Sequence, residues 1–257
     1  MKKALALLVA IAIGVISIQA SAAAAVPEKL SIEFWPEYDD DQILFIAAVE
    51  YPQNEPLPIE VKLPVPKGAA VSWSGEILGG PSSQDVRAVP RIETKDTYDE
   101  ISFKLNKSRR GQVEARWAGL QLNGATRSIA WEWVPAFKAK SVQIGIKAPS
   151  QSSIVNMSPQ SVNVLSGPDK LSYYVSSPTP LVPGQKQTYR ITYNRATSGP
   201  SVSPQQQQAL QESSGQGAGP GAPTTSSAEN SVVYVLIAVA AGAIFFAVHA
   251  FQKRKTA

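Results

Sequence analysis

An alternation of apolar and polar residues with a period of two runs through the sequence from residue 30 to residue 194. In one segment, Ile59, Val61 and Leu63 alternate with Glu60 and Lys62. Successive side chains of a β-strand point to opposite faces of a sheet, so this period is typical of strands. Proline, glycine and asparagine separate the alternating segments, and no segment has a convincing helical period. We therefore predict an all-β fold built as one or more β-sandwiches.

An internal repeat indicates that this region consists of two related units. A shift of 83 residues places Ile59 on Val142, and a shift of 70 places Asp99 on Asp169. Chance resemblance between alternating sequences is the alternative explanation. The repeat predicts two tandem Ig-like β-sandwich units, the first over residues 26–122 and the second, shorter one over 123–195.

The two halves of the β region carry opposite charge. Residues 28–100 include 15 acidic and 6 basic side chains, a net charge of −9, whereas residues 101–195 include 3 acidic and 13 basic, a net charge of +10. Such halves attract each other within one molecule or between neighbours, or the basic half faces anionic headgroups or wall polymers. The sequence has no phosphate loop and no nucleic-acid motif, so we expect no nucleic-acid partner.

Apolar segments at the two ends predict export and anchoring. Lys2 and Lys3 precede an apolar run that ends in small residues, which is typical of a secretory signal peptide. The uncharged segment 232–251 is long enough to cross a bilayer, and the basic residues that follow it mark the cytoplasmic side. We predict a single-pass cell-membrane protein with its β region extracytoplasmic: a signal peptide over 1–25, a transmembrane helix over 231–252 and a cytoplasmic basic tail over 253–257.

Residues 196–230 connect the β region to the predicted helix and are mostly Ser, Gly, Pro and Gln. Such a composition cannot bury enough apolar surface to offset the entropy of ordering, so we predict a disordered linker. Within the predicted helix, Ala238 and Gly242 have the small-xxx-small spacing that lets two helices approach closely, which predicts a weak homo-association.

The absence of cysteine and the scarcity of histidine exclude several kinds of site. A chain without Cys forms no disulfide, no thiolate metal site and no lipid anchor at the mature N-terminus. The only histidine, His249, lies in the apolar C-terminal segment, so the β region has no imidazole for catalysis or metal binding.

The acidic cluster at 37–41 fits no calcium loop, and we interpret it as a polar turn in which Glu37, Asp39 and Asp41 are weak candidates for a cation site. We expect no cofactor.

The five tryptophans divide into core candidates and one surface candidate. Trp131 and Trp133 share a strand face with Ile129, which predicts burial. Trp35 is out of phase with its apolar neighbours and is followed by Pro36, so it is the best candidate for an exposed aromatic contact or for a role between the two units.

Two parts of the sequence resemble an uncharacterised group of bacterial exported, C-terminally membrane-anchored β-sandwich proteins. One is Ile-Glu-Phe-Trp-Pro-Glu-Tyr-Asp at 32–39 with the apolar strand that follows, and the other runs from Asn123-Gly124 through Trp133 to Pro149. The resemblance covers most of residues 30–194. It implies an all-β anchored protein and implies no activity.

These features predict a binding or scaffold module of the cell envelope, not an enzyme, with another envelope protein as its partner. An accessory subunit of a membrane enzyme or assembly complex is the first alternative. The second is a carbohydrate-active enzyme that uses paired carboxylates. Its candidate groups are strand residues that face away from the apolar side chains, although no feature pairs any two of them: Glu33, Glu50, Glu114 and Glu132.

Overall fold

The computed structural model describes residues 24–167, 169–203 and 205–206, and these form an all-β structure with one short 3₁₀ helix. The predicted all-β class is therefore confirmed. The elements are β1 (Lys29–Pro36), β2 (Ile43–Glu50), β3 (Ile59–Pro66), β4 (Ala70–Glu76), η1 (Ser82–Gln84), β5 (Val86–Arg87), β6 (Arg91–Thr94), β7 (Tyr98–Leu105), β8 (Arg110–Trp117), β9 (Gln121–Asn123), β10 (Thr126–Trp133), β11 (Ala139–Lys147), β12 (Ser152–Ser158), β13 (Ser161–Ser166), β14 (Ser172–Ser176), β15 (Thr179–Leu181) and β16 (Gln187–Arg195).

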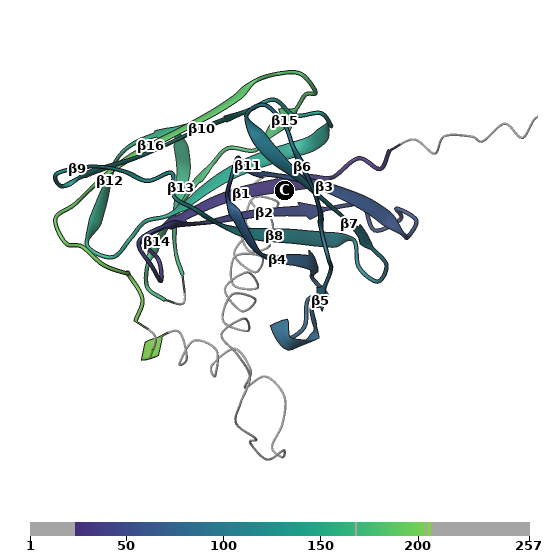
Figure 1. The fold of residues 1–257 in the computed structure, drawn as a ribbon, viewed down its shortest axis with the longest axis horizontal. Coiled ribbons are helices and arrows are strands. Elements are labelled where there is room, and N and C mark those ends of the chain that lie inside the picture. The colour runs from purple at the N-terminus through teal and green to yellow at the C-terminus, as the bar shows by residue number, and fades with distance from the viewer. Residues whose placement is uncertain (1–23, 168, 204, 207–257) are drawn as a thin grey trace, which may run out of the picture.

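The strands form one large sheet and two small ones. The large sheet has the order β13-β14-β11-β1-β2-β8-β4-β5, with β15 also paired to β11. The small sheets have the orders β12-β16-β10-β9 and β3-β7-β6. In Figure 1 the four-stranded sheet lies at the upper left of the large sheet and the three-stranded sheet at its right. The result is a sandwich-like arrangement.

One hydrophobic core joins all three sheets. Phe34 of β1, Val61 of β3 and Trp131 of β10 all belong to a single cluster of buried side chains. The Trp131 ring lies 5.1 Å from the Phe45 ring and 5.8 Å from the Trp133 ring, centroid to centroid. The predicted burial of Trp131 and Trp133 is confirmed, since they are 4% and 0% exposed. Such aromatic contacts add to the free energy gained from removing apolar area from water.

The pairing order of the first half recurs in the second half. The order β9-β10-β16-β12 repeats β1-β2-β8-β4, and the order β11-β14-β13 repeats β3-β7-β6. Every neighbouring pair in these four series is antiparallel. The strands that the 83-residue shift relates, β3 and β11, thus have corresponding neighbours and lie in different sheets.

The junction between the halves is a parallel pairing of β1 with β11, in which Leu30 lies opposite Val142 and Phe34 opposite Ile146. This pairing places four strands of the second predicted unit, β11, β13, β14 and β15, in one sheet with strands of the first. The predicted units over 26–122 and 123–195 consequently share both a sheet and a core.

No helix within the described residues is long and apolar enough to span a membrane. Outside the described part of the chain lie the predicted transmembrane helix, the predicted basic tail and all but the last two residues of the predicted signal peptide.

The start of the predicted linker is described. There the Ser201 amide donates to the Glu37 carbonyl (2.8 Å), the Val202 amide donates to the Tyr38 carbonyl (2.9 Å), and Val202 is buried. Residues 201–202 of the predicted linker thus pack on the turn that follows β1.

Candidate functional site

A groove opens between β12 and β13, which are consecutive in the sequence but belong to different sheets. Each of these strands ends the order of its own sheet, so each has an unpaired edge. The groove has a volume of about 790 Å³. It is lined by Ile154, Val155, Asn156, Met157, Ser158, Gln160, Ser161, Val162, Asn163, Val164 and Tyr174.

The side chains around this groove are apolar or uncharged. Val155, Val162 and Val164 are 60%, 54% and 57% exposed. Residues 148–168, which include both strands, contain no charged residue. Exposed edge strands normally carry charges, prolines or bulges that prevent the addition of another strand. β12 has a register shift between Ile154 and Asn156, and β13 has one between Ser161 and Asn163, but neither strand carries a charge. Away from these shifts, the two edges offer open backbone groups and apolar side chains to an incoming chain.

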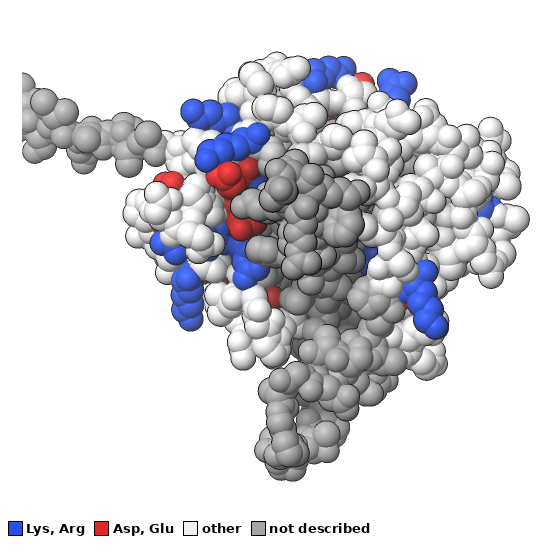
Figure 2. Space-filling model, turned by 180° about the vertical axis from the view of Figure 1, so that it is seen from behind, with Lys and Arg blue, Asp and Glu red and all other residues white. Residues whose placement is uncertain are grey.

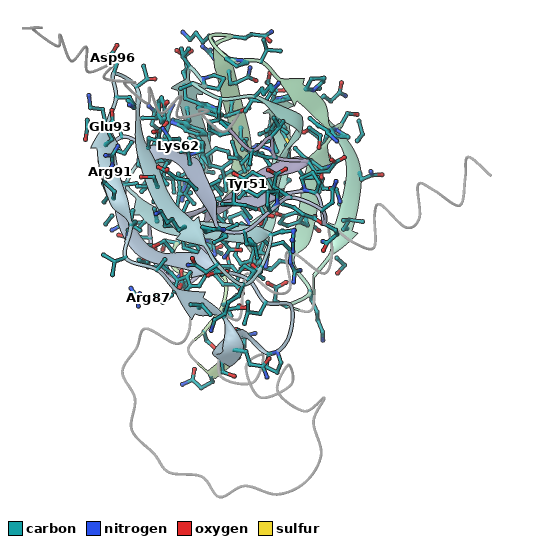
Figure 3. All side chains as sticks on the ribbon, turned by 90° about the vertical axis from the view of Figure 1, so that its right-hand side faces the viewer. Tyr51, Lys62, Arg87, Arg91, Glu93 and Asp96 are labelled. Carbon is teal, nitrogen blue, oxygen red and sulfur yellow. The ribbon has the colours of Figure 1, made fainter. Side chains whose placement is uncertain are left out.

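Other edge strands of the structure are protected in the usual way. On β6, the edge of the three-stranded sheet, exposed Arg91 and Glu93 form an ion pair of 3.1 Å. Figure 3 shows both of these side chains with Asp96 along one side of the molecule. On the opposite edge, β3 carries Lys62, which lies 3.3 Å from Glu100. The edge strand β5 contains Arg87, and the edge strands β9 and β15 are only three residues long.

Charged side chains are unevenly distributed over the surface. The side of the molecule that carries β9, β12 and β13 in Figure 1 lies at the right in Figure 2. Most of the surface there is uncharged, whereas acidic and basic residues gather at the left of that view. Strands β12 and β13, which carry no charged side chain, lie on this side of the molecule.

The acidic cluster at 37–41 is directed toward arginines. Glu37 lies 3.0 Å from the Arg195 guanidinium and accepts a hydrogen bond from the Tyr193 hydroxyl (2.7 Å). Asp39 accepts two hydrogen bonds from Arg116, while Asp41 is exposed. The described residues contain no group of three or more His, Cys, Asp or Glu arranged to hold a metal ion. The Glu37 and Asp39 carboxylates, which the sequence predicts as weak candidates for a cation site, are compensated by different arginines.

The prediction that Trp35 is an exposed contact is wrong, because its side chain is 0% exposed. Its ring packs on Tyr38 at 5.0 Å between centroids, and the Lys147 Nζ lies 3.5 Å from its centroid. The reason is a second apolar cluster on the outer face of the large sheet, where Trp35 joins Leu44, Tyr173 and others. Trp35 on β1 thereby contacts β11, which belongs to the second predicted unit.

Sequence reasoning did not identify Glu33 and Glu114 as buried groups. They are 5% and 0% exposed, and both lie opposite Ile46 of the intervening strand β2. Burial raises the pKa of Glu114 to about 8 and raises the pKa of Glu33 as well. The alternation of β1 and β8 placed both on a polar face, and only the tertiary structure makes that face a buried one.

Comparison with known proteins gives weak structural similarities. No protein family and no curated protein matches the chain. Native leukotriene A4 hydrolase from Saccharomyces cerevisiae has a TM-score of 0.37 at 7% identity, over 66% of this chain and 29% of that one. An M1 zinc metallopeptidase from Deinococcus radiodurans has a TM-score of 0.35 at 12% identity, over 66% of this chain and 42% of that one. The chain spans less than half the length of these structures.

Proposed function

We propose that the protein is a membrane-anchored, extracytoplasmic module of the cell envelope that binds an extended segment of another protein between β12 and β13. The observation that carries this proposal is the pair of uncharged, open edge strands around one groove. An extended peptide that adds to a sheet edge gains main-chain hydrogen bonds, while pockets for alternate side chains provide specificity. The exposed Val162 and Val164 alternate along β13 in the way that such recognition requires.

The chemistry of the groove determines the chemistry of its partner. No charged side chain lies on β12 or β13, so a strongly charged segment would lose hydration there without gaining an ion pair. The partner segment is therefore extended, uncharged and apolar at every second residue.

The remaining parts of the chain suit a tethered module. The repeated pairing order supports two tandem Ig-like units fused through β1 and β11. The sequence of 1–25 and of 231–252 supports export and anchoring, and the Ser- and Gly-rich residues beyond 203 support a linker that lets the β region reach its partner.

A charge placed on one groove strand tests the proposal. Val164→Lys introduces an ammonium group at a side chain that is 57% exposed, and Ile92→Lys does the same on edge strand β6 at a side chain that is 53% exposed. Each full-length protein is purified from its own membranes with its partners, which are quantified by mass spectrometry. We expect Val164→Lys to lower the amount of one co-purifying envelope protein at least about 10-fold, which corresponds to about 1.4 kcal/mol. Equal losses in both variants, or none in either, would overturn the proposal.

The alternative of an accessory subunit is distinguished by the anchor. Replacing residues 231–252 with an unrelated apolar helix leaves the groove intact. Retention of the partner supports binding through the groove, and its loss supports an accessory subunit that uses the membrane span.

The carbohydrate-active alternative has less support. A glycosidase needs one protonated and one ionised carboxyl group. Glu33 and Glu114 share a face, but burial favours the protonated form of both, and the apolar Ile46 lies between them.

A further inference from the structure

Lys147 and Asp169 form a buried pair at the end of β11. The Lys147 Nζ lies 2.8 Å from Asp169 Oδ2, and both side chains are only 4% exposed. The ammonium group also lies 3.5 Å from the centroid of the Trp35 ring and 4.8 Å from that of Tyr38. The Tyr38 hydroxyl donates to the same Asp169 oxygen (3.2 Å). An amine and a carboxyl group are thus held in contact inside an aromatic enclosure.

A third ionisable group lies beside this pair. Glu33 is opposite Gly145 in the parallel pairing of β1 with β11, so it is a diagonal neighbour of Lys147 on the same face of the sheet. Its carboxyl accepts a hydrogen bond from Trp35 Nε1 (3.1 Å). Gly145 has no side chain, and the Tyr173 ring occupies the space over it. A Cβ atom on residue 145 would lie only 2.8 Å from the Tyr173 hydroxyl.

The buried surroundings favour uncharged forms of two of these groups. Burial lowers the pKa of Lys147, although Asp169 and Glu33 act in the opposite direction. Burial also raises the pKa of Glu33. A neutral amine is a nucleophile and a protonated carboxyl group is a general acid, so both groups are brought toward the forms that acyl transfer needs.

We propose that Lys147 and Asp169 join in an intramolecular isopeptide bond, with Glu33 transferring the protons. The Lys147 ammonium first gives one proton to the Asp169 carboxylate, which leaves a neutral amine and a carboxylic acid in contact. The Lys147 Nζ then attacks Cγ of Asp169, so that an N–C bond forms. After the attack, protonated Glu33 delivers its proton to the departing hydroxyl oxygen and takes one proton from the nitrogen, and the C–O bond breaks. An ammonium and a carboxylate thereby become an amide and one water molecule, without an oxidant, a reductant or any other reactant.

The contact geometry is suited to this step. A separation of 2.8 Å between Nζ and Oδ2 brings the nitrogen near the attack distance of about 3–3.5 Å from Cγ. The hydrogen bond from Tyr38 to Oδ2 draws electrons away from the carbon that is attacked. Exclusion of water by Trp35, Tyr38 and Tyr173 favours the amide over its hydrolysis.

The bond would have a structural consequence for the groove. The two residues are 22 apart in the sequence, and the loop that they close contains both β12 and β13. Closing a loop covalently restricts the unfolded chain, an effect that disulfides provide in many exported proteins and that a chain without Cys lacks. The bond would thus join a residue that precedes β12 to a residue that follows β13, and so restrict the positions of both groove strands. Formation of the bond requires no groove ligand and is independent of the proposed function.

Peptide mapping of the full-length protein purified from its membrane tests the bond. Trypsin does not cleave after a lysine whose amine is acylated, so the bond predicts one looped peptide, 141–170, lighter than its sequence by one water. Cyanogen bromide then cleaves at Met157, the one methionine in this peptide, and the two pieces stay joined. Separate peptides 141–147 and 148–170 would overturn the proposal. A dehydrated peptide 141–170 whose two pieces separate after cleavage at Met157 would also overturn the proposal. Asp169 can lose water without joining Lys147, and a peptide changed in that way has no bond that holds the pieces together.

Variants test the role of Glu33. Lys147→Arg keeps the positive charge and should abolish the looped peptide. Glu33→Gln should slow its appearance after synthesis about 100-fold, as loss of a proton-transfer group does. Glu114→Gln alters the other buried carboxyl group of the same face and should leave the looped peptide unchanged. Equal rates in Glu33→Gln and the unchanged protein would overturn the assignment of Glu33.

Discussion

Buried charged residues connect the two halves of the molecule at the end of β1. Glu37 adopts a left-handed backbone conformation (φ 47°) and contacts Arg195 of β16 and Arg127 of β10. All three side chains are less than 10% exposed. The opposite charges of the two halves are therefore used within one molecule, where a pair left incomplete is far more costly than one at the surface.

Removing the Glu37 charge should destabilise the fold strongly. Glu37→Gln leaves Arg195 and Arg127 buried without an acidic partner, and we expect a loss of roughly 3 kcal/mol in the free energy of unfolding. The control is Glu28→Gln, which removes an exposed pair with Lys140 and should cost less than about 1 kcal/mol. Urea unfolding measures both, and similar losses in the two variants would contradict the role assigned to Glu37.

Glu114 should make stability fall as pH rises. Burial raises its folded-state pKa from 4.5 to about 8, so between these values the folded protein holds a proton that the unfolded chain has released. The free energy of unfolding then decreases from about pH 5 to about pH 8, by at most roughly 5 kcal/mol for this one group. Glu114→Gln should reduce this fall, and the raised pKa of Glu33 should leave a remaining decrease of the same sign. A profile that Glu114→Gln does not alter would show that the carboxyl is ionised in the folded protein.

At the scale of elements, the positions of strands could be predicted from the sequence and their pairing could not. The alternation around Ile59 and Val142 coincides with β3 and β11, and both strands direct these residues into the same core. The 83-residue shift fails for β2 and β10, because Ile46 faces the outer cluster and Ile129 the main core. The pairing of β1 with β11 joins strands about 110 residues apart, and no local pattern encodes such a contact.

The packing of β11 against β14 depends on the absence of a side chain at Gly145. A Cβ there would lie 2.8 Å from the Tyr173 hydroxyl, so Gly145→Ala should cost about 1–3 kcal/mol of stability. The buried Tyr173 hydroxyl interacts with the Glu33 carboxyl group, so Tyr173→Phe alone should cost about 1 kcal/mol. Thermal unfolding of the double variant should recover part of the loss. If the stability losses of Gly145→Ala and Tyr173→Phe add in the double variant, the contact between residue 145 and the Tyr173 hydroxyl is not the cause of the Gly145→Ala loss.

At the scale of the whole molecule, the two predicted units depend on a common core. Trp131 of the second half packs on Phe34 and Phe45 of the first, and Trp133 packs on Tyr98. The sequence showed that these tryptophans are core residues, but their partners lie too far along the chain to be inferred from alternation.

Neither half should therefore fold alone. Fragments covering 24–122 and 123–206 each expose the aromatic residues that the other covers, and each lacks one strand of the β1–β11 pairing. We expect near-UV circular dichroism to show no fixed aromatic packing in either fragment and to show it in their mixture. Cooperative unfolding of one isolated fragment would contradict a shared core.

At the same scale, we propose that the groove between β12 and β13 receives a segment of another envelope protein. The most direct measurement places a photo-reactive amino acid at position 164, or at the equally exposed position 92 as a control, in the full-length protein in intact cells. Illumination should cross-link position 164 to one membrane or envelope protein, in a discrete product that position 92 does not give. No product at position 164, or the same products at both positions, would show that the groove does not bind such a segment.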